Sequence, residues 1–233
     1  MTEPEHSIGD PQQEEHYWLP ISDLMTGLMI LFLFVSITYM AKVDLEGRKI
    51  KDVAVAWNVG KQKLYHSLDT AFARDLPKWN AEIDSVSLSV RFKEPDVLFA
   101  SGSSEVRPRF REILKDFFPR YVAIVRAYRE YVDEVRVEGH TSSEGPAQKP
   151  YYYNMELSQN RTRAVLEFCL ENTDVSEVDK SWLRSSLTAN GLSSSRPVRL
   201  ASGAEDRDRS RRVEFRVRTN TEVRIASILQ LSK

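Results

Sequence analysis

The chain has 233 residues, of which 41% are hydrophobic, and its 33 basic and 34 acidic residues leave a formal net charge of -1 at pH 7. This length accommodates one membrane anchor and one domain of about 150 residues. The balanced charge gives no support for a nucleic-acid partner, so we expect no direct contact with nucleic acid. The single cysteine, Cys169, excludes an internal disulfide and is expected in the core.

The N-terminal part divides into an acidic tail and an apolar run. Residues 1–16 are polar and are expected to form a tail. We expect a transmembrane helix over 17–45, because a helix of about 21 residues, the length of the apolar run 21–41, spans roughly 30 Å, the thickness of a bilayer's hydrocarbon core. Trp18 and Tyr39 stand where interfacial aromatic belts are expected. The run is too long for the apolar region of a cleavable signal peptide.

Asp23 is the one charged residue inside this apolar run. A carboxylate in the hydrocarbon core is costly, which makes it a candidate for ion or proton translocation. The alternative is a helix cap, because Pro20 and Ser22 also suit a helix start and an acidic residue there meets the positive end of the helix dipole. The run by itself does not separate the two interpretations.

Basic residues follow the apolar run at Lys42, Arg48, Lys49 and Lys51. Taken alone, the positive-inside rule would place the C-terminal side in the cytoplasm. Beyond them, 46–82 is expected to be a helical connector or stalk, with apolar residues at roughly helical spacing and an end at Pro77. These apolar positions are Val55, Val59, Leu64, Leu68 and Phe72.

The remainder, 83–220, alternates amphipathic strands with helices and is followed by a tail at 221–233. This alternation predicts an α+β domain, a two-layer α/β sandwich. The expected strands are 84–92, 132–141, 187–191 and 211–219, and the expected helices are 108–128, 154–171 and 178–184. Arginines at 207, 209, 211 and 212 alternate with Asp206 and Asp208, which indicates a surface turn with many ion pairs.

Motifs for metals, cofactors and catalysis are missing. The sequence has no CxxC or HExxH spacing and no glycine-rich phosphate loop, and its four histidines are scattered without partners at ligand spacing. We therefore expect no metal and no cofactor. No nucleophile–base pair stands out, so we expect no enzymatic activity and assign His140 to loop packing.

Two segments resemble the OmpA-like peptidoglycan-binding family. Gly139-His140-Thr141-Ser142 is similar to the end of a family strand, and the helix with Asn154, Leu157, Ser158, Arg161 and Thr162 is similar to the family's N-x-x-L-S-x-x-R-A pattern. The stretch 96–108 upstream resembles the family's first-strand signature, and the stretches 190–198 and 210–217 downstream resemble its last loop and strand. The resemblance implies a two-layer OmpA-like fold that binds peptidoglycan.

The candidate peptidoglycan-binding residues are Tyr153, Asn154, Leu157 and Arg161. A guanidinium recognises carboxylates of the peptide stem through paired hydrogen bonds. Asn154 is expected to cap the helix, Tyr153 to pack over the ligand and Leu157 to seat the helix on the sheet. The alternative for Arg161 is a surface ion pair with Glu156 or Glu167. The family's acidic residue is Ser142 here, and Glu144 is a candidate replacement.

The order of an apolar helix with an early aspartate, a connector and an OmpA-like domain resembles the MotB-like stator B subunits of rotary motors, and more closely the ZorB family of the Zorya anti-phage defence system. The resemblance implies a homodimer inside a pentamer of ZorA- or MotA-like A subunits, with Asp23 carrying the ion, a proton or sodium. It implies a single-pass protein of the bacterial inner membrane, with a cytoplasmic N-terminus, a periplasmic domain and indirect coupling to cytoplasmic effectors. A flagellar-type stator and a simple membrane-to-wall tether are the alternatives.

Overall fold

The computed structural model describes residues 11–93, 95–146 and 148–219, which fall into two compact units that meet in sequence at Val53 and Ala54. Helix α1 (Pro11–Phe72) begins in the first unit and ends in the second. The expected tails at 1–16 and 221–233 lie wholly or mostly outside the described residues, and so does the side chain of Trp18.

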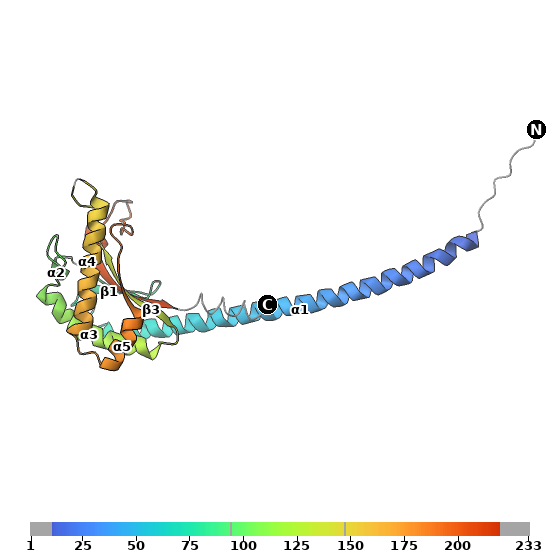
Figure 1. The fold of residues 1–233 in the computed structure, drawn as a ribbon, viewed down its shortest axis with the longest axis horizontal. Coiled ribbons are helices and arrows are strands. Elements are labelled where there is room, and N and C mark those ends of the chain that lie inside the picture. Colours follow the sequence, from blue (N-terminus) through green and yellow to red (C-terminus); the bar gives the residue numbers. More distant parts are fainter. Residues whose placement is uncertain (1–10, 94, 147, 220–233) are drawn as a thin grey trace, which may run out of the picture. The chain divides into compact units, whose positions relative to one another are not determined.

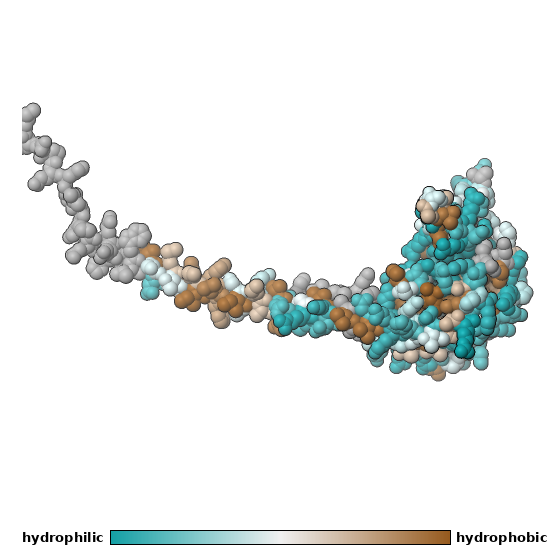
Figure 2. Space-filling view, turned by 180° about the vertical axis from the view of Figure 1, so that it is seen from behind, coloured by the Kyte–Doolittle hydropathy of each residue, from teal (hydrophilic) through white to brown (hydrophobic). Residues whose placement is uncertain are grey.

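Among the residues described, the first unit consists of the N-terminal part of α1. Within it, Ile21–Asp52 is long and apolar enough to cross a membrane, and the described ranges contain no second helix of this kind. Its large apolar side chains are exposed, among them Leu24, Met29 and Phe32, and Figure 2 shows them as a run of hydrophobic surface. The expected helix is confirmed, and its passage through a membrane stays a prediction.

The C-terminal part of α1 packs into the second unit. Leu64, Leu68 and Phe72 are buried in the core, whereas Val55 and Val59 are exposed, so the predicted apolar stripe divides into two parts. The helix ends at Phe72, earlier than the expected Pro77. The early end is explained by Arg120, whose side chain donates a hydrogen bond to the carbonyl of Ala71. This carbonyl lies in the last turn, where no backbone N–H group further along the helix can bind it.

The second unit is a five-stranded sheet with helices on one face (Figure 1). The strand order is β1-β2-β5-β3-β4, and β3 and β4 are parallel while the other neighbours are antiparallel. The strands are β1 (Ala81–Asp84), β2 (Ser89–Phe92), β3 (Val132–His140), β4 (Leu187–Gly191) and β5 (Arg212–Thr219). The helices are α3 (Pro108–Ala127), α4 (Pro150–Glu171) and α5 (Glu177–Ser186), with short α2 (Pro95–Leu98) and α6 (Arg207–Ser210). The predicted two-layer α/β domain is confirmed.

The predicted strand 84–92 is wrong, because the chain turns back within it. The Asp84 carboxylate accepts the backbone N–H groups of Val86 and Ser87, at 2.8 and 2.9 Å, and Leu88 adopts a positive φ of 50°. Such a local side-chain bond favours a turn over a continuing strand. The segment therefore contains the turn and the second strand of the β1–β2 hairpin. Val86 lies at the tip of this hairpin and is 80% exposed.

Glycines at the ends of two strands allow α4 to approach the sheet closely. A Cβ atom on Gly139 would lie 2.6 Å from Cγ2 of Thr162, and one on Gly191 would lie 2.6 Å from the backbone Cα of Gln159. Neither contact is possible without movement, since real Cβ atoms essentially never come within 3.0 Å of such neighbours. The absence of a side chain at the two glycines therefore allows α4 to pack close against β3 and β4.

Replacing Gly191 with alanine is expected to lower the free energy of unfolding by about 2 kcal/mol or more, because overpacking against backbone forces α4 away from the sheet. Thermal unfolding followed by circular dichroism would measure this as a lower Tm. Gly47→Ala is the control, because a Cβ there meets nothing within 4 Å. An equal Tm for both variants would show that α4 does not depend on this close approach.

Candidate functional site

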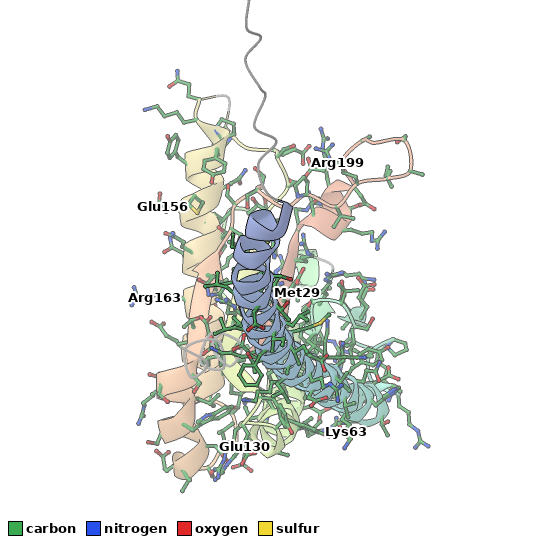
Figure 3. The ribbon with its side chains drawn as sticks, turned by 90° about the vertical axis from the view of Figure 1, so that its right-hand side faces the viewer. Met29, Lys63, Glu130, Glu156, Arg163 and Arg199 are labelled. Atoms are coloured by element: carbon green, nitrogen blue, oxygen red, sulfur yellow. The ribbon has the colours of Figure 1, made fainter. Side chains whose placement is uncertain are left out.

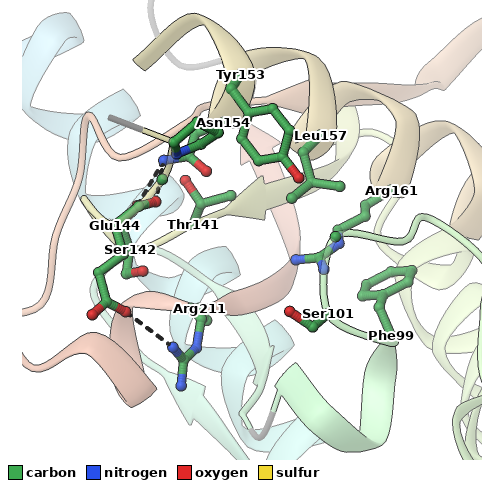
Figure 4. Close-up of a pocket in the computed structure, with 13 residues that line it drawn as sticks. Phe99, Ser101, Thr141, Ser142, Glu144, Tyr153, Asn154, Leu157, Arg161 and Arg211 are labelled. Atoms are coloured by element: carbon green, nitrogen blue, oxygen red, sulfur yellow. Dashed lines mark hydrogen bonds and ion pairs between the residues drawn. The ribbon is translucent and has the colours of Figure 1, made fainter. Parts of the chain in front are cut away.

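A pocket of about 380 Å³ opens in the second unit beside the N-terminal half of α4 (Figure 4). Its walls come from the segment after α2, the loop after β3, α4 and the residue after α6. All four predicted peptidoglycan-binding residues, Tyr153, Asn154, Leu157 and Arg161, line this pocket. The structure therefore brings the predicted residues together in one cavity, while their role in binding remains a prediction.

Arg161 is a buried cation at the wall of the pocket. It is 9% exposed, and its Nε and Nη2 groups donate to the carbonyls of Ser103 (2.8 Å) and Ala100 (3.2 Å). Its guanidinium carbon lies 4.9 Å from the centre of the Phe99 ring. Burial lowers the pKa of Arg161 from its ordinary value, because desolvation disfavours the charged form. These contacts fix the guanidinium in place.

No carboxylate forms an ion pair with Arg161 within the described part of the chain. The alternative of a surface pair with Glu156 or Glu167 is wrong, because Glu167 pairs with Arg163 at 2.8 Å. Figure 3 shows Glu156 and Arg163 on the outward side of α4, and neither residue lines the pocket. A buried charge without a partner is costly, so an anionic ligand in the pocket would compensate Arg161.

Asn154 does not cap α4, contrary to the sequence expectation. The helix begins at Pro150, a residue that suits the first helical position, with Lys149 before it at a positive φ of 54°. Asn154 is instead buried in the second turn, where Nδ2 donates to the carbonyls of Ser142 (3.2 Å) and Glu144 (2.7 Å). It ties the loop after β3 to the helix and so shapes one wall of the pocket.

The early helix start also separates Arg161 from the amides at the helix N-terminus, which favour anions. This residue lies about three turns into α4, too far for the amides of the first turn to act on the same ligand group. Tyr153 is 41% exposed, and its hydroxyl is close enough to Gly102 that a Cβ there would lie 3.3 Å away. Leu157 is half-buried and lines the pocket, rather than only seating the helix.

Sequence reasoning missed Arg211 and Thr141 as pocket residues. Arg211 was placed in a surface turn, and its ion pair with Asp208 belongs there, but its side chain also lines the pocket. The Nε atom of Arg211 and the Oγ1 atom of Thr141 are buried without hydrogen-bond partners among the residues described. The pocket therefore offers several unused polar groups to a ligand.

The position of the family's acidic residue is occupied by Ser142, and the role of Glu144 as its replacement stays a prediction. Ser142 is buried and neutral, at 4% exposure. Glu144, two residues on, lines the pocket and pairs with Arg207 at 2.6 Å and with Arg211 at 3.6 Å. The dashed line in Figure 4 marks its pair with Arg211.

A buried polar network lies on the opposite face of the sheet from the helices. His140 Nε2 is 3.9 Å from Oε2 of Glu138 and 3.8 Å from Oε1 of Glu214, and both ring nitrogens lack hydrogen-bond partners in the described residues. Burial, with Arg212 nearby, lowers the pKa of His140 to about 3, although Glu214 opposes the shift. His140 is therefore neutral at pH 7 and lies at the end of β3 within a charged network, while its expected role in packing stays a prediction.

The donor atoms of Glu138, His140 and Glu214 lie within 4.8 Å of one another, a spacing that can hold a metal ion. The sequence argument that no histidine has a partner at ligand spacing is therefore wrong for His140. Four guanidinium groups already pair with the two carboxylates, and their positive charge disfavours a divalent cation. They belong to Arg91, Arg196, Arg212 and Arg216. The absence of a metal stays a prediction.

His140 is expected to make stability depend on pH between about 6.5 and 3. The unfolded chain binds a proton to His140 below its ordinary pKa, whereas the folded protein does not until about pH 3, so stability is lost as the pH falls. The loss at pH 5 is about 2 kcal/mol relative to pH 7. The pKa of Glu214 is lowered by Arg212 against the effect of burial, and such carboxylates contribute only at lower pH.

Urea unfolding at pH 7 and pH 5 would measure this effect. In His140→Gln the difference in unfolding free energy between the two pH values should shrink by most of the expected change of about 2 kcal/mol. The same difference in wild type and variant would contradict the assignment.

Asp23 lies in the first unit on α1, with an exposed side chain. One turn on, the Thr26 hydroxyl donates to the carbonyl of Ser22 at 2.8 Å, within the same helix. No ion pair involves Asp23 within the described ranges. The geometry of the chain alone therefore leaves both interpretations of Asp23 open.

The comparisons with known proteins cover different shares of the chain. The OmpA family model matches residues 98–211. The chain is similar to solved structures of a putative MotB-like protein from Desulfovibrio vulgaris (TM-score 0.49, 24% identity, 75% of this chain and 99% of that chain) and of the cell wall anchor of the T6SS from Pseudomonas aeruginosa (TM-score 0.46, 27% identity, 65% and 96%). It is 47% identical over 222 residues to Zorya protein ZorB of Escherichia coli (strain Crooks), covering 94% of each chain. An identity of this extent shows that the chain belongs to the ZorB family.

Proposed function

We propose that this chain is the B subunit of a wall-anchored, ion-driven rotary motor complex that acts in anti-phage defence. Membership of the ZorB family and the OmpA-like domain support a stator-like B subunit. The observation that carries the wall-binding part is Arg161, a buried cation without a carboxylate partner in the described residues, which borders an open pocket.

Peptidoglycan carries the negatively charged groups that could pair with the unpaired cation of this pocket. Its peptide stems carry carboxylates, and those with diaminopimelate also carry an amine beside a carboxylate. A carboxylate in the pocket would compensate the buried charge of Arg161 and meet the unused groups of Thr141 and Arg211. Tyr153 and Leu157 would pack against the apolar part of the stem.

Asp23 is the proposed ion carrier. Protonation removes its charge and with it the cost of keeping a carboxylate in an apolar slab, so proton binding and release would change how α1 contacts its neighbours. Two copies of the chain inside a ring of five A subunits would expose two such carboxylates. Their alternate protonation would drive stepwise rotation of the ring, and cytoplasmic effectors would respond to the motor indirectly.

The proposed topology places the N-terminus in the cytoplasm and the OmpA-like domain in the periplasm of a single-pass inner-membrane protein. Peptidoglycan lies outside the cytoplasm, so a domain that binds it must lie there too. The basic residues after the apolar run, Lys42, Arg48, Lys49 and Lys51, then break the positive-inside rule. Contacts with the A subunits would have to outweigh this weak bias.

Protease treatment of spheroplasts tests the topology. The domain should be cleaved from outside while a cytoplasmic marker stays intact, and protection of the domain would reject the proposal. Phage challenge and swimming assays, with the A subunit co-expressed, separate the defence motor from a flagellar-type stator. Protection without rescue of motility is the expected result.

A further inference from the structure

Three consecutive tyrosines form an exposed aromatic surface at the start of α4. Tyr151, Tyr152 and Tyr153 are 46%, 70% and 41% exposed. Among the described residues from 60 to 219, no other phenylalanine, tyrosine or tryptophan is exposed. Contiguous apolar surface is costly to leave in water, and tyrosine is enriched where proteins bind partners. The concentration of exposed rings in one helical turn therefore indicates a binding surface.

Tyr151 and Tyr152, here called the tyrosine pair, are held in place from below. The carbonyl of Tyr151 accepts a hydrogen bond from Oγ of Ser193 at 2.9 Å, and the backbone N–H of Ser193 donates to Oγ of Ser158 at 3.0 Å. Both serines are buried. The two rings meet edge to face, with centroids 5.8 Å apart and planes at 83°, a favoured aromatic arrangement. A ring pair fixed in this way loses little conformational entropy when a ligand binds.

The tyrosine pair adjoins the pocket at the start of α4. Gly145 lines the pocket and packs against Pro150, because a Cβ atom on the glycine would lie 2.9 Å from Cβ of the proline. Tyr153 lines the pocket too, and Figure 4 shows it beside the cavity. Successive side chains of a helix point about 100° apart. The three rings therefore extend from the rim of the pocket around the first turn of the helix.

The direction of the cavity relates the tyrosine pair to Arg161. Along the axis of α4, Arg161 lies about 12 Å beyond Tyr153, at a rise of about 1.5 Å per residue, and both residues line the pocket. In peptidoglycan the sugars are attached to the amino end of the peptide stem, and the free carboxylates lie further along the stem. A stem that places a carboxylate at Arg161 and follows α4 towards its start brings its sugars to the tyrosine pair.

We infer that the tyrosine pair binds the glycan strand of peptidoglycan, by packing its rings against the apolar C–H faces of N-acetylated amino sugars. The inference rests on the proposed peptidoglycan binding and adds a sugar subsite outside the pocket. Tyrosine suits such a ligand, because the ring contacts C–H groups while the hydroxyl exchanges hydrogen bonds with sugar hydroxyl and acetamido groups. The pocket then holds the peptide, and the tyrosine pair holds the sugars.

Two ligands that differ only in their sugars test this inference. One is the disaccharide tetrapeptide that a muramidase releases from sacculi, and the other is the same tetrapeptide capped with the lactyl group alone. Calorimetric titration of the full-length protein in detergent should show about fivefold tighter binding of the ligand with sugars. In Tyr152→Ala the ratio of the two affinities should fall towards one. Tyr152→Phe should keep most of the ratio, because the ring remains.

Val178→Ala is the matched control for the loss of an exposed apolar side chain. Val178 is 66% exposed, lies in the first turn of α5 and does not line the pocket. This variant should keep the wild-type ratio. Circular dichroism should show all three variants folded at the temperature of the titration, because the substituted side chains are exposed. Equal affinity of the wild-type protein for the two ligands would overturn the inference.

The remaining outcomes separate the inference from the proposed function. If the wild-type protein binds neither ligand, the wall-binding proposal fails, and the inference fails with it. If Tyr152→Ala keeps the wild-type ratio, the sugar subsite is wrong while wall binding stands. If that variant in addition forms a smaller assembly in analytical ultracentrifugation, the tyrosine pair contacts a second copy of the chain instead of a glycan.

Discussion

The Arg161→Gln variant is expected to lose binding to peptidoglycan sacculi by a factor of about 30 or more. Removing one partner of a buried charge pair costs about 2 kcal/mol or more, and the ligand carboxylate would enter a pocket that no longer compensates it. Co-sedimentation over a range of sacculus concentrations measures the change. Cells that carry the variant should also lose phage protection, because the motor has no fixed point on the wall.

Arg163→Gln is the matched control, because Arg163 lies on the same helix, faces outward and pairs with Glu167. It should bind sacculi like wild type. Arg161→Gln also leaves the carbonyls of Ala100 and Ser103 without their donors, so its Tm should fall. Binding is therefore compared at a temperature where circular dichroism shows both variants folded. Equal binding by both would place the wall contact elsewhere.

The Asp23→Asn variant is expected to assemble with the A subunits and to give no protection against phage. Asparagine keeps the size and polarity of aspartate but cannot carry a proton, and it is cheaper to bury in a membrane. Co-purification with tagged A subunit measures assembly, and plaque assays measure protection. A simple tether, in which Asp23 only caps a helix, predicts full protection.

Asp44→Asn is the control for this substitution. Asp44 lies on the same helix beyond the apolar run, is exposed and pairs with Arg48 at 2.8 Å. The same chemical change there removes only a surface ion pair, which contributes at most about 1 kcal/mol. Protection should therefore remain. Loss of protection in both variants would indicate a general sensitivity of α1 to lost charge.

Most of the domain could be predicted because its elements carry strong local patterns. Helix α3 starts at Pro108 as predicted, and β3, β4 and β5 match their predicted ranges within one residue at each end. The four site residues of α4 could be grouped because this segment resembles the OmpA-like family pattern, whose spacing also places Asn154, Leu157 and Arg161 along one side of a helix. All of them line the pocket.

The errors occurred where a side chain forms a bond that periodicity does not reveal. The alternation of apolar and polar residues predicted one strand over 84–92. The Asp84 carboxylate instead accepts hydrogen bonds from two backbone N–H groups, and the chain turns there. Asn154 was expected as a cap by its residue type, whereas Pro150 starts the helix one turn earlier and leaves the asparagine to hold the loop. Both outcomes depend on local bonds that compete with regular structure.

The residues missed in the site depend on the tertiary fold. Arg211 follows a charged turn in the sequence, and only the pairing of β5 with β3 brings it beside the loop that carries Glu144. His140 and Glu214 are 74 positions apart and meet because their strands are neighbours in the sheet. No spacing rule within one segment predicts such contacts.

Ion flux through the assembled complex tests the central claim most directly. Vesicles that contain the A subunits with either wild-type or Asp23→Asn B subunits would be given an inward proton gradient, and then a sodium gradient, while a lumenal indicator follows ion entry. We predict entry of one of these ions with wild type and only background entry with the variant. Equal flux in both would contradict the assignment of Asp23 as the ion carrier.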